Sequence, residues 1–274
     1  MMEGIKMKIG FIGIGNMGSA VALGVSKAVD QHTPFLLSNH NHEKANSLSQ
    51  QISQTVEILD NETIASSATI IFLGLKPSMI LSELHQLTKL AKPGTIWISM
   101  ATGVSIAQME SVISDEQKVI RIMPNTPVAI GQGMTTYILS DFITDDEHQL
   151  FKQLMSQTGQ LMKIAESQMN AASAVAGCGP AFIYQLIEAL ADGGVRAGLP
   201  REMAQRLAAQ MVQGSAQMVI ETGQHPGALK DAVTSPEGST IAGVASLEQN
   251  GFRHAAMEAV YQSFLKTECM SQSN

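Results

Sequence analysis

Three glycines near the start of the chain have the spacing of a phosphate-binding loop. Gly13, Gly15 and Gly18 form the pattern G-x-G-x-x-G within the segment KIGFIGIGNMGSA. An apolar run precedes them and a helical pattern follows, which is the context in which this motif binds a dinucleotide. The helix would start at Asn16 and Met17 and present its free N–H groups to the phosphates. We therefore predict a dinucleotide site here, the alternative being a glycine-rich turn that binds no ligand.

The residues after the second expected strand bear on which nicotinamide cofactor is used. Proteins that bind NAD usually carry an Asp or Glu about 20 residues after the glycines, where it holds the ribose 2′-hydroxyl. No acidic residue lies between Asp30 and Glu43, and Ser38, Asn39 and His40 stand in its place. Neutral donors tolerate a 2′-phosphate, so we expect NADPH to be preferred over NADH. An Arg that often accompanies such a site is missing; His40 either replaces it or is a solvated loop residue.

Three further loops follow expected strands and carry polar or turn-forming residues. They are the segments FLGLKP, ISMATGVSI and RIMPNTP. In an open α/β sheet the ligand lies beyond the carboxyl ends of the strands, so we expect these loops at the nicotinamide end of the cofactor. Each of them alone is also compatible with ordinary turn chemistry. The residues concerned are Leu75, Lys76, Pro77, Ala101, Thr102 and Asn125.

The segment TSPEGST, residues 234–240, places small and hydroxylated residues between two helical patterns. Such a loop exposes N–H groups and hydroxyls at the start of a helix and can bind a carboxylate. The alternative is purely structural, because Ser239 or Thr240 could be the residue that caps the next helix.

The elements that must position these residues divide the chain near residue 165. Up to there, short β-branched runs alternate with helical patterns, which predicts βαβ units and a mostly parallel sheet. We expect strands at residues 8–12, 35–38, 69–73, 95–99, 119–122, 134–139 and 159–164, and helices at 16–29, at 43–51 and from 145. The predicted fold class is an α/β Rossmann-like domain over residues 1–165, followed by an all-α domain over residues 166–274.

The predicted helices of the second domain are unusually apolar. Helical patterns cover residues 180–197, 201–222 and 251–266, and the first two are apolar over much of their circumference. A region of this size has too small an interior for so many apolar side chains, so we expect at least a homodimer formed through these helices.

Composition excludes several other classes of protein. The net charge of −7 and an aromatic content of 4% argue against nucleic-acid binding. Two cysteines, Cys178 and Cys269, cannot form a disulfide framework, so we expect a reduced, cytoplasmic protein. The longest uncharged stretch, residues 167–187, contains polar residues and Pro180, and we expect no membrane span. No H-E-x-x-H or paired C-x-x-C occurs, and we expect no metal.

The chain resembles the pyrroline-5-carboxylate reductase family over almost its whole length. The resemblance runs through GFIGIGNMG, FLGLKP, RIMPNTP, GCGPAFIYQLIEALADGGVRAGLPR and LKDAVTSPEGSTIAG. The first motif is common to dinucleotide binders, whereas the last two in this order and spacing are specific. The resemblance implies NADPH-dependent reduction of the C=N bond of 1-pyrroline-5-carboxylate to L-proline.

The same resemblance implies roles for individual residues. The Thr240 hydroxyl should reach the ring nitrogen of the substrate, and Asn61 should lie near the adenosine ribose. The residues implied to bind the substrate are Pro180, Ser235, Gly238, Ser239 and Thr240. Two positions depart from the family pattern, because Glu237 stands where a glycine is common and Cys178 where a serine is common.

Two other functions remain open on the sequence. β-Hydroxyacid dehydrogenases also join a Rossmann domain to helices, but they place a Lys on the helix after a glycine-rich segment, and residues 179–187 contain none. A regulatory protein that binds NADP without catalysis would keep Gly13, Gly15 and Gly18, yet it would have no need of the loop at residues 235–240.

Overall fold

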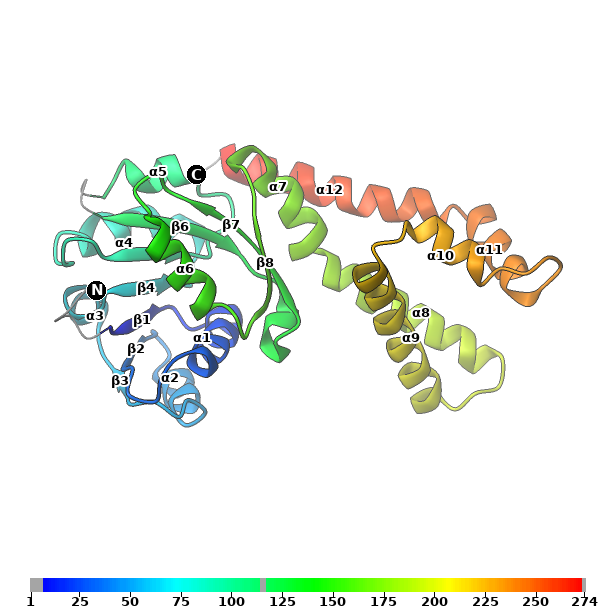
Figure 1. Cartoon of the computed structure of the whole chain (residues 1–274), viewed down its shortest axis with the longest axis horizontal. Helices are drawn as coiled ribbons and strands as arrows, with labels where there is room; N and C mark the ends of the chain where they lie inside the picture. The colour runs from blue at the N-terminus through cyan, green and yellow to red at the C-terminus, as the bar shows by residue number, and fades with distance from the viewer. Residues whose placement is uncertain (1–6, 114–116, 273–274) are drawn as a thin grey trace. The chain divides into compact units, whose positions relative to one another are not determined.

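A computed structural model describes residues 7–113 and 117–272 of the chain (Figure 1). Its eight-stranded sheet has the order β3-β2-β1-β4-β5-β6-β7-β8. Neighbouring strands are parallel except for β6 and β7, which pair antiparallel. The strands are β1 (Ile9–Ile12), β2 (Phe35–Ser38), β3 (Val56–Ile58), β4 (Ile70–Leu73), β5 (Ile96–Ser99), β6 (Lys118–Met123), β7 (Gly133–Leu139) and β8 (Gly159–Lys163). The parallel order places the loops that follow β1, β2, β4, β5 and β6 along one edge of the sheet, where a ligand binds in this architecture.

Helices connect the strands and continue alone after β8. Those that belong with the sheet are α1 (Asn16–Ala28), α2 (His42–Ser49), α3 (Asn61–Ser67), α4 (Pro77–Leu87), α5 (Ile106–Glu110), η1 (Thr126–Ile130) and α6 (Asp145–Leu154). After the sheet come η2 (Glu166–Gln168), α7 (Met169–Ala172), the π-helical turn η3 (Ser173–Gly177), α8 (Gly179–Arg196), α9 (Arg201–Thr222), α10 (Pro226–Ala232), α11 (Ser239–Gln249) and α12 (Phe252–Gln272). The predicted fold class is confirmed. The seven strands that the sequence predicted have bounds within one residue of those expected, whereas β3 was not predicted.

Each face of the sheet is buried by a different set of helices. One apolar cluster joins Phe11, Phe35 and Phe72 of the sheet to residues of α1, α2 and α6. The ring of Phe11 stacks on that of Phe72 with the centroids 4.5 Å apart. The other cluster joins Ile71 and Trp97 to residues of α3, α4, α5 and α7. Successive strand residues alternate between the two clusters, as the two-residue period of a β-strand requires.

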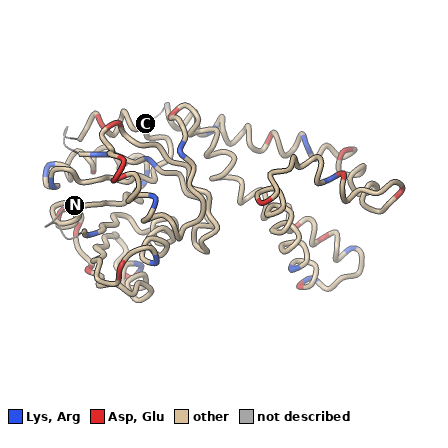
Figure 2. Tube along the Cα trace, viewed as in Figure 1, with Lys and Arg blue, Asp and Glu red and all other residues tan. Residues whose placement is uncertain are grey.

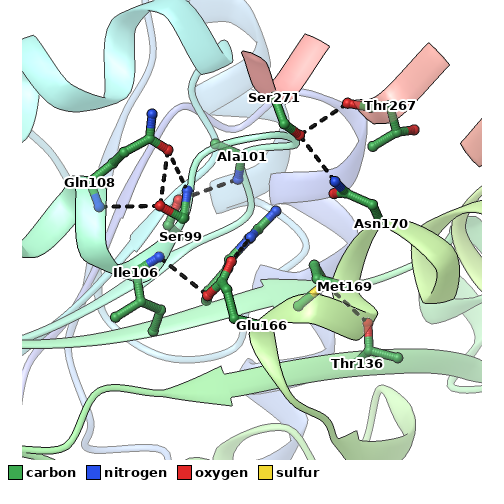
Figure 3. Close-up of polar contacts among 12 residues, drawn as sticks. Ser99, Ala101, Ile106, Gln108, Thr136, Glu166, Met169, Asn170, Thr267 and Ser271 are labelled. Atoms are coloured by element: carbon green, nitrogen blue, oxygen red, sulfur yellow. Dashed lines mark hydrogen bonds and ion pairs between the residues drawn. The ribbon is translucent and has the colours of Figure 1, made fainter. Parts of the chain in front are cut away.

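The chain forms two compact units, residues 1–178 with 263–274 and residues 179–262. This division differs from the predicted boundary at residue 165, because the residues that follow β8 still pack on the sheet. Met169 is fully buried in the second of the apolar clusters. The last turns of α12 also belong to the first unit, where the side-chain amide of Asn170 donates a hydrogen bond to Glu268 Oε1 at 2.6 Å. The same amide donates to Ser271 Oγ at 3.3 Å (Figure 3).

The second unit buries little of its apolar surface within one chain. Its buried core among the described residues consists of Ala191, Ala204 and Ala208, where α8 packs on α9. Large side chains such as Met203, Leu207 and Met218 are about half exposed. Residues 207–220 of α9 carry no charge, and Figure 2 shows a correspondingly long uncharged stretch. These surfaces are the ones from which the sequence predicted contacts between subunits.

One helical run, Glu166–Arg196, is long and apolar enough to cross a membrane by length and composition. Only 11% of its most apolar window is buried within the chain. Length and composition alone are weak evidence for a membrane span, and this run includes α8, from which we predicted subunit contacts. Burial by a second subunit would account for the same apolar surface.

Candidate cofactor and substrate sites

The glycine-rich loop has the close contacts that its sequence predicts. Gly13 has a φ of +84°, and a Cβ there would lie 2.7 Å from the carbonyl oxygen of Gly74. A Cβ on Gly18 would lie 2.5 Å from the Gly13 carbonyl oxygen, so the start of α1 can approach β1 only without a side chain. A Cβ on Gly15 would meet no atom within 4 Å. Gly15 therefore borders open space, as a residue that must let a pyrophosphate approach the backbone should.

Helix starts along this edge of the sheet differ in how they are capped. Asn41 and Asp60 accept hydrogen bonds from the first turns of α2 and α3. By contrast, α1 follows Gly15 and α4 follows Lys76, and neither start receives a hydrogen bond from a capping side chain. Because the first N–H groups of a helix have no partner within the helix, the start of α1 at Asn16 and Met17 can donate to a phosphate. The chain thus fits a dinucleotide at the predicted place.

Polar side chains join the end of β2 to α3 and α4. The Ser38 hydroxyl donates to Asn61 Oδ1 at 2.6 Å, and the Asn61 amide donates in turn to Glu83 Oε2 at 3.1 Å. These bonds fix the orientation of the Asn61 amide beside the position that an acidic residue occupies in NAD-binding proteins. Sequence reasoning selected Ser38 and Asn61 but missed Glu83, which lies on the next helix, α4, and has no motif of its own.

Asn39 has a structural role in addition to its predicted position. Its side-chain oxygen accepts a hydrogen bond from the Ile14 N–H at 3.3 Å, and its amide donates to the Asn41 carbonyl at 3.0 Å. The glycine-rich loop is thereby tied to the start of α2. His40 follows Asn39 and is exposed to solvent.

The three loops that were predicted to line the nicotinamide end of the cofactor follow β4, β5 and β6 in the structure. Lys76 caps the start of α4 with its backbone, and Pro77 is the first residue of that helix. Leu75 packs beside the second apolar cluster of the sheet. Ala101 is buried, and the Thr102 hydroxyl lies 3.9 Å from the sulfur of Met123.

The side chain of Asn125 makes two hydrogen bonds to backbone groups of the protein. Its amide donates to the carbonyl of Ala176 at 2.9 Å, and its oxygen accepts from the N–H of Met134 at 2.9 Å. The residue thus ties the loop after β6 to the π-helical turn η3, just before Cys178. Its predicted contact with the cofactor stays a prediction, and these bonds leave one amide hydrogen and the loop backbone for it.

An ion pair with one buried partner lies near the same loops and was not predicted. The guanidinium of Arg121 on β6 pairs with Glu166, and the second carboxylate oxygen of Glu166 accepts from the Ile106 N–H at 3.4 Å (Figure 3). The Arg121 side chain is 4% exposed and that of Glu166 is 40% exposed. Burial lowers the pKa of Arg121 from its ordinary value, and the neighbouring Glu166 carboxylate opposes this shift. The pair joins β6 to the start of α5 and to the segment after β8.

The predicted substrate loop ends at the start of α11, in the second unit. Gly238 is the capping position, and it supplies no side chain. Ser239 and Thr240 are the first two residues of the helix, so neither is the cap that the structural alternative required. The Gly238 N–H donates to the Ser235 carbonyl at 3.1 Å, and a Cβ on Gly238 would lie 2.5 Å from Ser235 Oγ. The Gly238 N–H is thus engaged within the loop, and no side chain caps the first N–H groups of α11.

Glu237 and Pro180 complete the set of predicted substrate residues. Among the described residues other than glycine, Glu237 alone has a positive φ, of 59°. L-residues with a Cβ rarely adopt this left-handed conformation, which explains why a glycine suits the position. Pro180 is the second residue of α8 and is half-buried. No group of three or more His, Cys, Asp or Glu side chains that could hold a metal occurs in the described parts of the chain.

A mostly parallel sheet, a glycine-rich loop after β1 and an uncapped helix at the ligand edge define a dinucleotide-binding α/β domain, here followed by a helical unit. Family sequence models match both parts, "NADP oxidoreductase coenzyme F420-dependent" at residues 8–103 and "Pyrroline-5-carboxylate reductase dimerisation" at residues 166–270. The pyrroline-5-carboxylate reductase of Escherichia coli strain K12 is 38% identical over 98% of this chain and 100% of its own length. The chain belongs to the pyrroline-5-carboxylate reductase family.

Other relatives and solved structures agree with this membership. The pyrroline-5-carboxylate reductase of Pisum sativum is 37% identical over 92% of both chains. The crystal structure of the Plasmodium falciparum pyrroline carboxylate reductase with NADP bound has a TM-score of 0.86 and 31% identity, and it covers 98% of this chain and 100% of that one. A pyrroline-5-carboxylate reductase from Coxiella burnetii has the same TM-score at 28% identity.

Proposed function

We propose that this chain catalyses the NADPH-dependent reduction of the C=N bond of 1-pyrroline-5-carboxylate to L-proline. The observation that carries the proposal is the start of α11, where Gly238 supplies no capping side chain and Ser239 and Thr240 begin the helix. A helix start of this kind favours an anion, and the substrate is a carboxylate. Full-length relatedness to named pyrroline-5-carboxylate reductases supports the same reaction.

The chain's own residues bind and orient the reactants in this proposal. NADPH, when bound, supplies the hydride that adds to the imine carbon, while the imine nitrogen becomes the amine of proline. The N–H groups of Ser239 and Thr240 hold the substrate carboxylate, since that of Gly238 donates to the Ser235 carbonyl, and the Thr240 hydroxyl fixes the ring nitrogen. A pyrroline that arrives already protonated needs no further proton from the enzyme. Thr240 then contributes orientation more than proton transfer, and Pro180 packs near the ring.

The residues that we propose to bind the cofactor lie in the first unit, along the edge where the parallel strands end. The pyrophosphate is held by the loop of Gly13, Gly15 and Gly18 and by the N–H groups of Asn16 and Met17. The adenosine ribose lies by Ser38, Asn39, His40 and Asn61, and the nicotinamide end lies by residues 75–77, 101, 102 and 125. NADPH is preferred over NADH because no carboxylate stands at the end of β2.

Assembly and location complete the proposal. The apolar faces of α8 and α9 form the contacts of at least a homodimer, for which the match to a dimerisation family model over residues 166–270 is the support. We propose a cytoplasmic protein, on the ground of its two free cysteines.

A direct assay tests the reaction. Purified protein is mixed with NADPH and pyrroline-5-carboxylate, NADPH oxidation is followed by absorbance, and proline is identified by mass spectrometry. Proline formed in a one-to-one ratio with NADPH oxidised supports the proposal. A 2-hydroxy-acid or 3-hydroxy-acid oxidised in place of this reaction, or cofactor binding with no turnover, contradicts it.

A further inference from the structure

Helix α10 (Pro226–Ala232) lies between α9 and the loop that leads to the proposed substrate site (Figure 1). It has seven residues, and none of them is buried within the chain. A helix of this length is marginal on its own, because its few hydrogen bonds do not offset the cost of nucleation. The groups that satisfy its two ends therefore decide how firmly it is formed.

One residue, His225, satisfies the start of α10. Its Nδ1 atom accepts a hydrogen bond from the Gly227 N–H at 3.0 Å. Its backbone carbonyl accepts from the N–H groups of Ala228 at 2.9 Å and of Leu229 at 3.3 Å. Pro226, the first residue of the helix, has no N–H. All three of these N–H groups therefore depend on His225.

The His225 side chain is exposed and acts as a helix cap, a role that Ser, Thr, Asp or Asn more often has. A neutral imidazole has one acceptor nitrogen and one N–H. Because Nδ1 accepts from Gly227, the ring hydrogen lies on Nε2. The substitution His225→Asn keeps an acceptor for this hydrogen bond, whereas His225→Ala removes it.

The end of α10 is joined to the substrate loop by a second set of local hydrogen bonds. The Thr234 hydroxyl donates to the Lys230 carbonyl at 2.6 Å, and the Thr234 N–H donates to the Asp231 carbonyl at 3.1 Å. Ser235 comes next, and its carbonyl accepts from the Gly238 N–H at 3.1 Å. The course of the chain into the start of α11 therefore depends on α10.

We propose that His225 is a positioning residue for the substrate, which acts through α10 on the loop at residues 234–238. The inference rests on the proposed function, because this loop leads to Ser239 and Thr240. When the cap is lost, α10 is formed for a smaller fraction of the time, and fewer molecules present a loop that is ready to bind. The apparent affinity for the substrate falls by that fraction, whereas hydride transfer in a molecule that has bound the substrate is unchanged.

Steady-state kinetics of the full chain at saturating NADPH test the proposal. The variants are His225→Ala, His225→Asn and the control His254→Ala. His254 is likewise an exposed histidine of the second unit, and it lies in the first turn of α12. Hydrogen exchange of the backbone amides of residues 226–240 is measured for each protein. Light scattering at one protein concentration follows its assembly.

We expect His225→Ala to raise the KM for pyrroline-5-carboxylate about fivefold, the factor by which losing a helix cap changes a folding equilibrium. Its kcat and its Kd for NADPH should stay within about twofold of native, the scale of a substitution that touches neither reactant. Amide exchange in residues 226–240 should be faster in His225→Ala than in native protein. His225→Asn and His254→Ala should match native protein in both KM and exchange.

Several results would overturn the inference. A native KM in His225→Ala, whatever its kcat, would show that substrate binding does not depend on α10. An equally raised KM in His225→Asn would mean that the imidazole itself contacts the substrate or a neighbouring subunit. A changed assembly in His225→Ala would assign the residue to subunit contacts. Absence of turnover in native protein would refute the proposed function and this inference together, and the native protein alone reveals that outcome.

Discussion

The ion pair between Arg121 and Glu166 allows a stability prediction whose size follows from burial. Glu166→Ala removes the carboxylate and leaves the Arg121 guanidinium, which is 4% exposed, without a counter-charge. The Nε atom of Arg121 already has no hydrogen-bond partner within the described structure. Removing one partner of a buried pair costs about 3–5 kcal/mol. Because Glu166 is 40% exposed, water can replace part of the interaction, and we expect about 2–3 kcal/mol.

This loss is large enough to measure by heat or urea unfolding at one fixed protein concentration. For a domain of this size it corresponds to a fall in Tm of about 4–12 °C. Glu248→Ala is the matched control, since its pair with Arg253 is exposed on both sides and should be worth about 1 kcal/mol or less.

A double-mutant cycle then isolates the pair. Arg121→Met removes the buried charge, and the double variant Arg121→Met with Glu166→Ala should be more stable than Glu166→Ala alone. Replacing a whole buried pair with apolar side chains is often neutral, whereas removing one partner is costly. A Glu166→Ala protein within about 0.5 kcal/mol of native, or a double variant no more stable than Glu166→Ala, would refute the reasoning.

Four further predictions concern the two ligand sites. Thr240→Ala should lower kcat/KM for pyrroline-5-carboxylate at least tenfold, a loss of about 1.4 kcal/mol, and should leave Tm and the cofactor Kd near native because Thr240 is not the helix cap. Thr240→Ser should retain most of the activity, and a native kcat/KM in Thr240→Ala would contradict the role. Glu237→Gly should lower the KM for the anionic substrate. It should not lower Tm, because it removes the strain of a left-handed backbone conformation, which costs a residue with a Cβ about 1–2 kcal/mol. A raised KM would show that the carboxylate helps binding. Glu83→Ala should raise the Kd for NADPH about fivefold, the scale of one net hydrogen bond, because the Asn61 amide loses its acceptor, and Glu83→Gln should restore the affinity; equal Kd values in all three proteins would argue that Asn61 is held in other ways. Ser38→Asp should weaken NADPH binding and spare NADH, measured as the ratio of the two kcat/KM values, and an unchanged ratio would place the cofactor's ribose elsewhere.

Several elements were missed in the sequence for a local reason. The edge strand β3 has three residues and is only partly buried, so it shows no continuous apolar run. Helices α3 and α5 have seven and five residues, too few for a helical period to stand out. The helix α4 starts at Pro77, inside a segment whose sequence predicts only a loop. Short elements of this kind are fixed by the sheet and helices around them more than by their own sequence.

The sequence by itself determined what depends on neighbouring residues. Continuous apolar runs specified the parallel strands, because such strands are buried on both faces. The glycine spacing specified the phosphate loop, because the close approach of Gly18 to Gly13 lies within six residues of chain. The absence of an acidic residue between Asp30 and Glu43 is likewise a local feature, and the preference for NADPH that it predicts stays a prediction. Specific motifs around residues 177–201 and 229–243 identified the family.

Only the tertiary structure decided the contacts between residues far apart in the chain. Arg121 lies among apolar residues on β6 with nothing local to indicate its partner, and Glu166 reaches it across 45 positions. The same holds for Glu83 with Asn61 and for Asn125 with Ala176, where a side chain finds its partner on another element. Hydrogen bonds of this kind depend on which faces the packed sheet and helices bring together. A linear pattern carries the period of one element and no information about its neighbour in space.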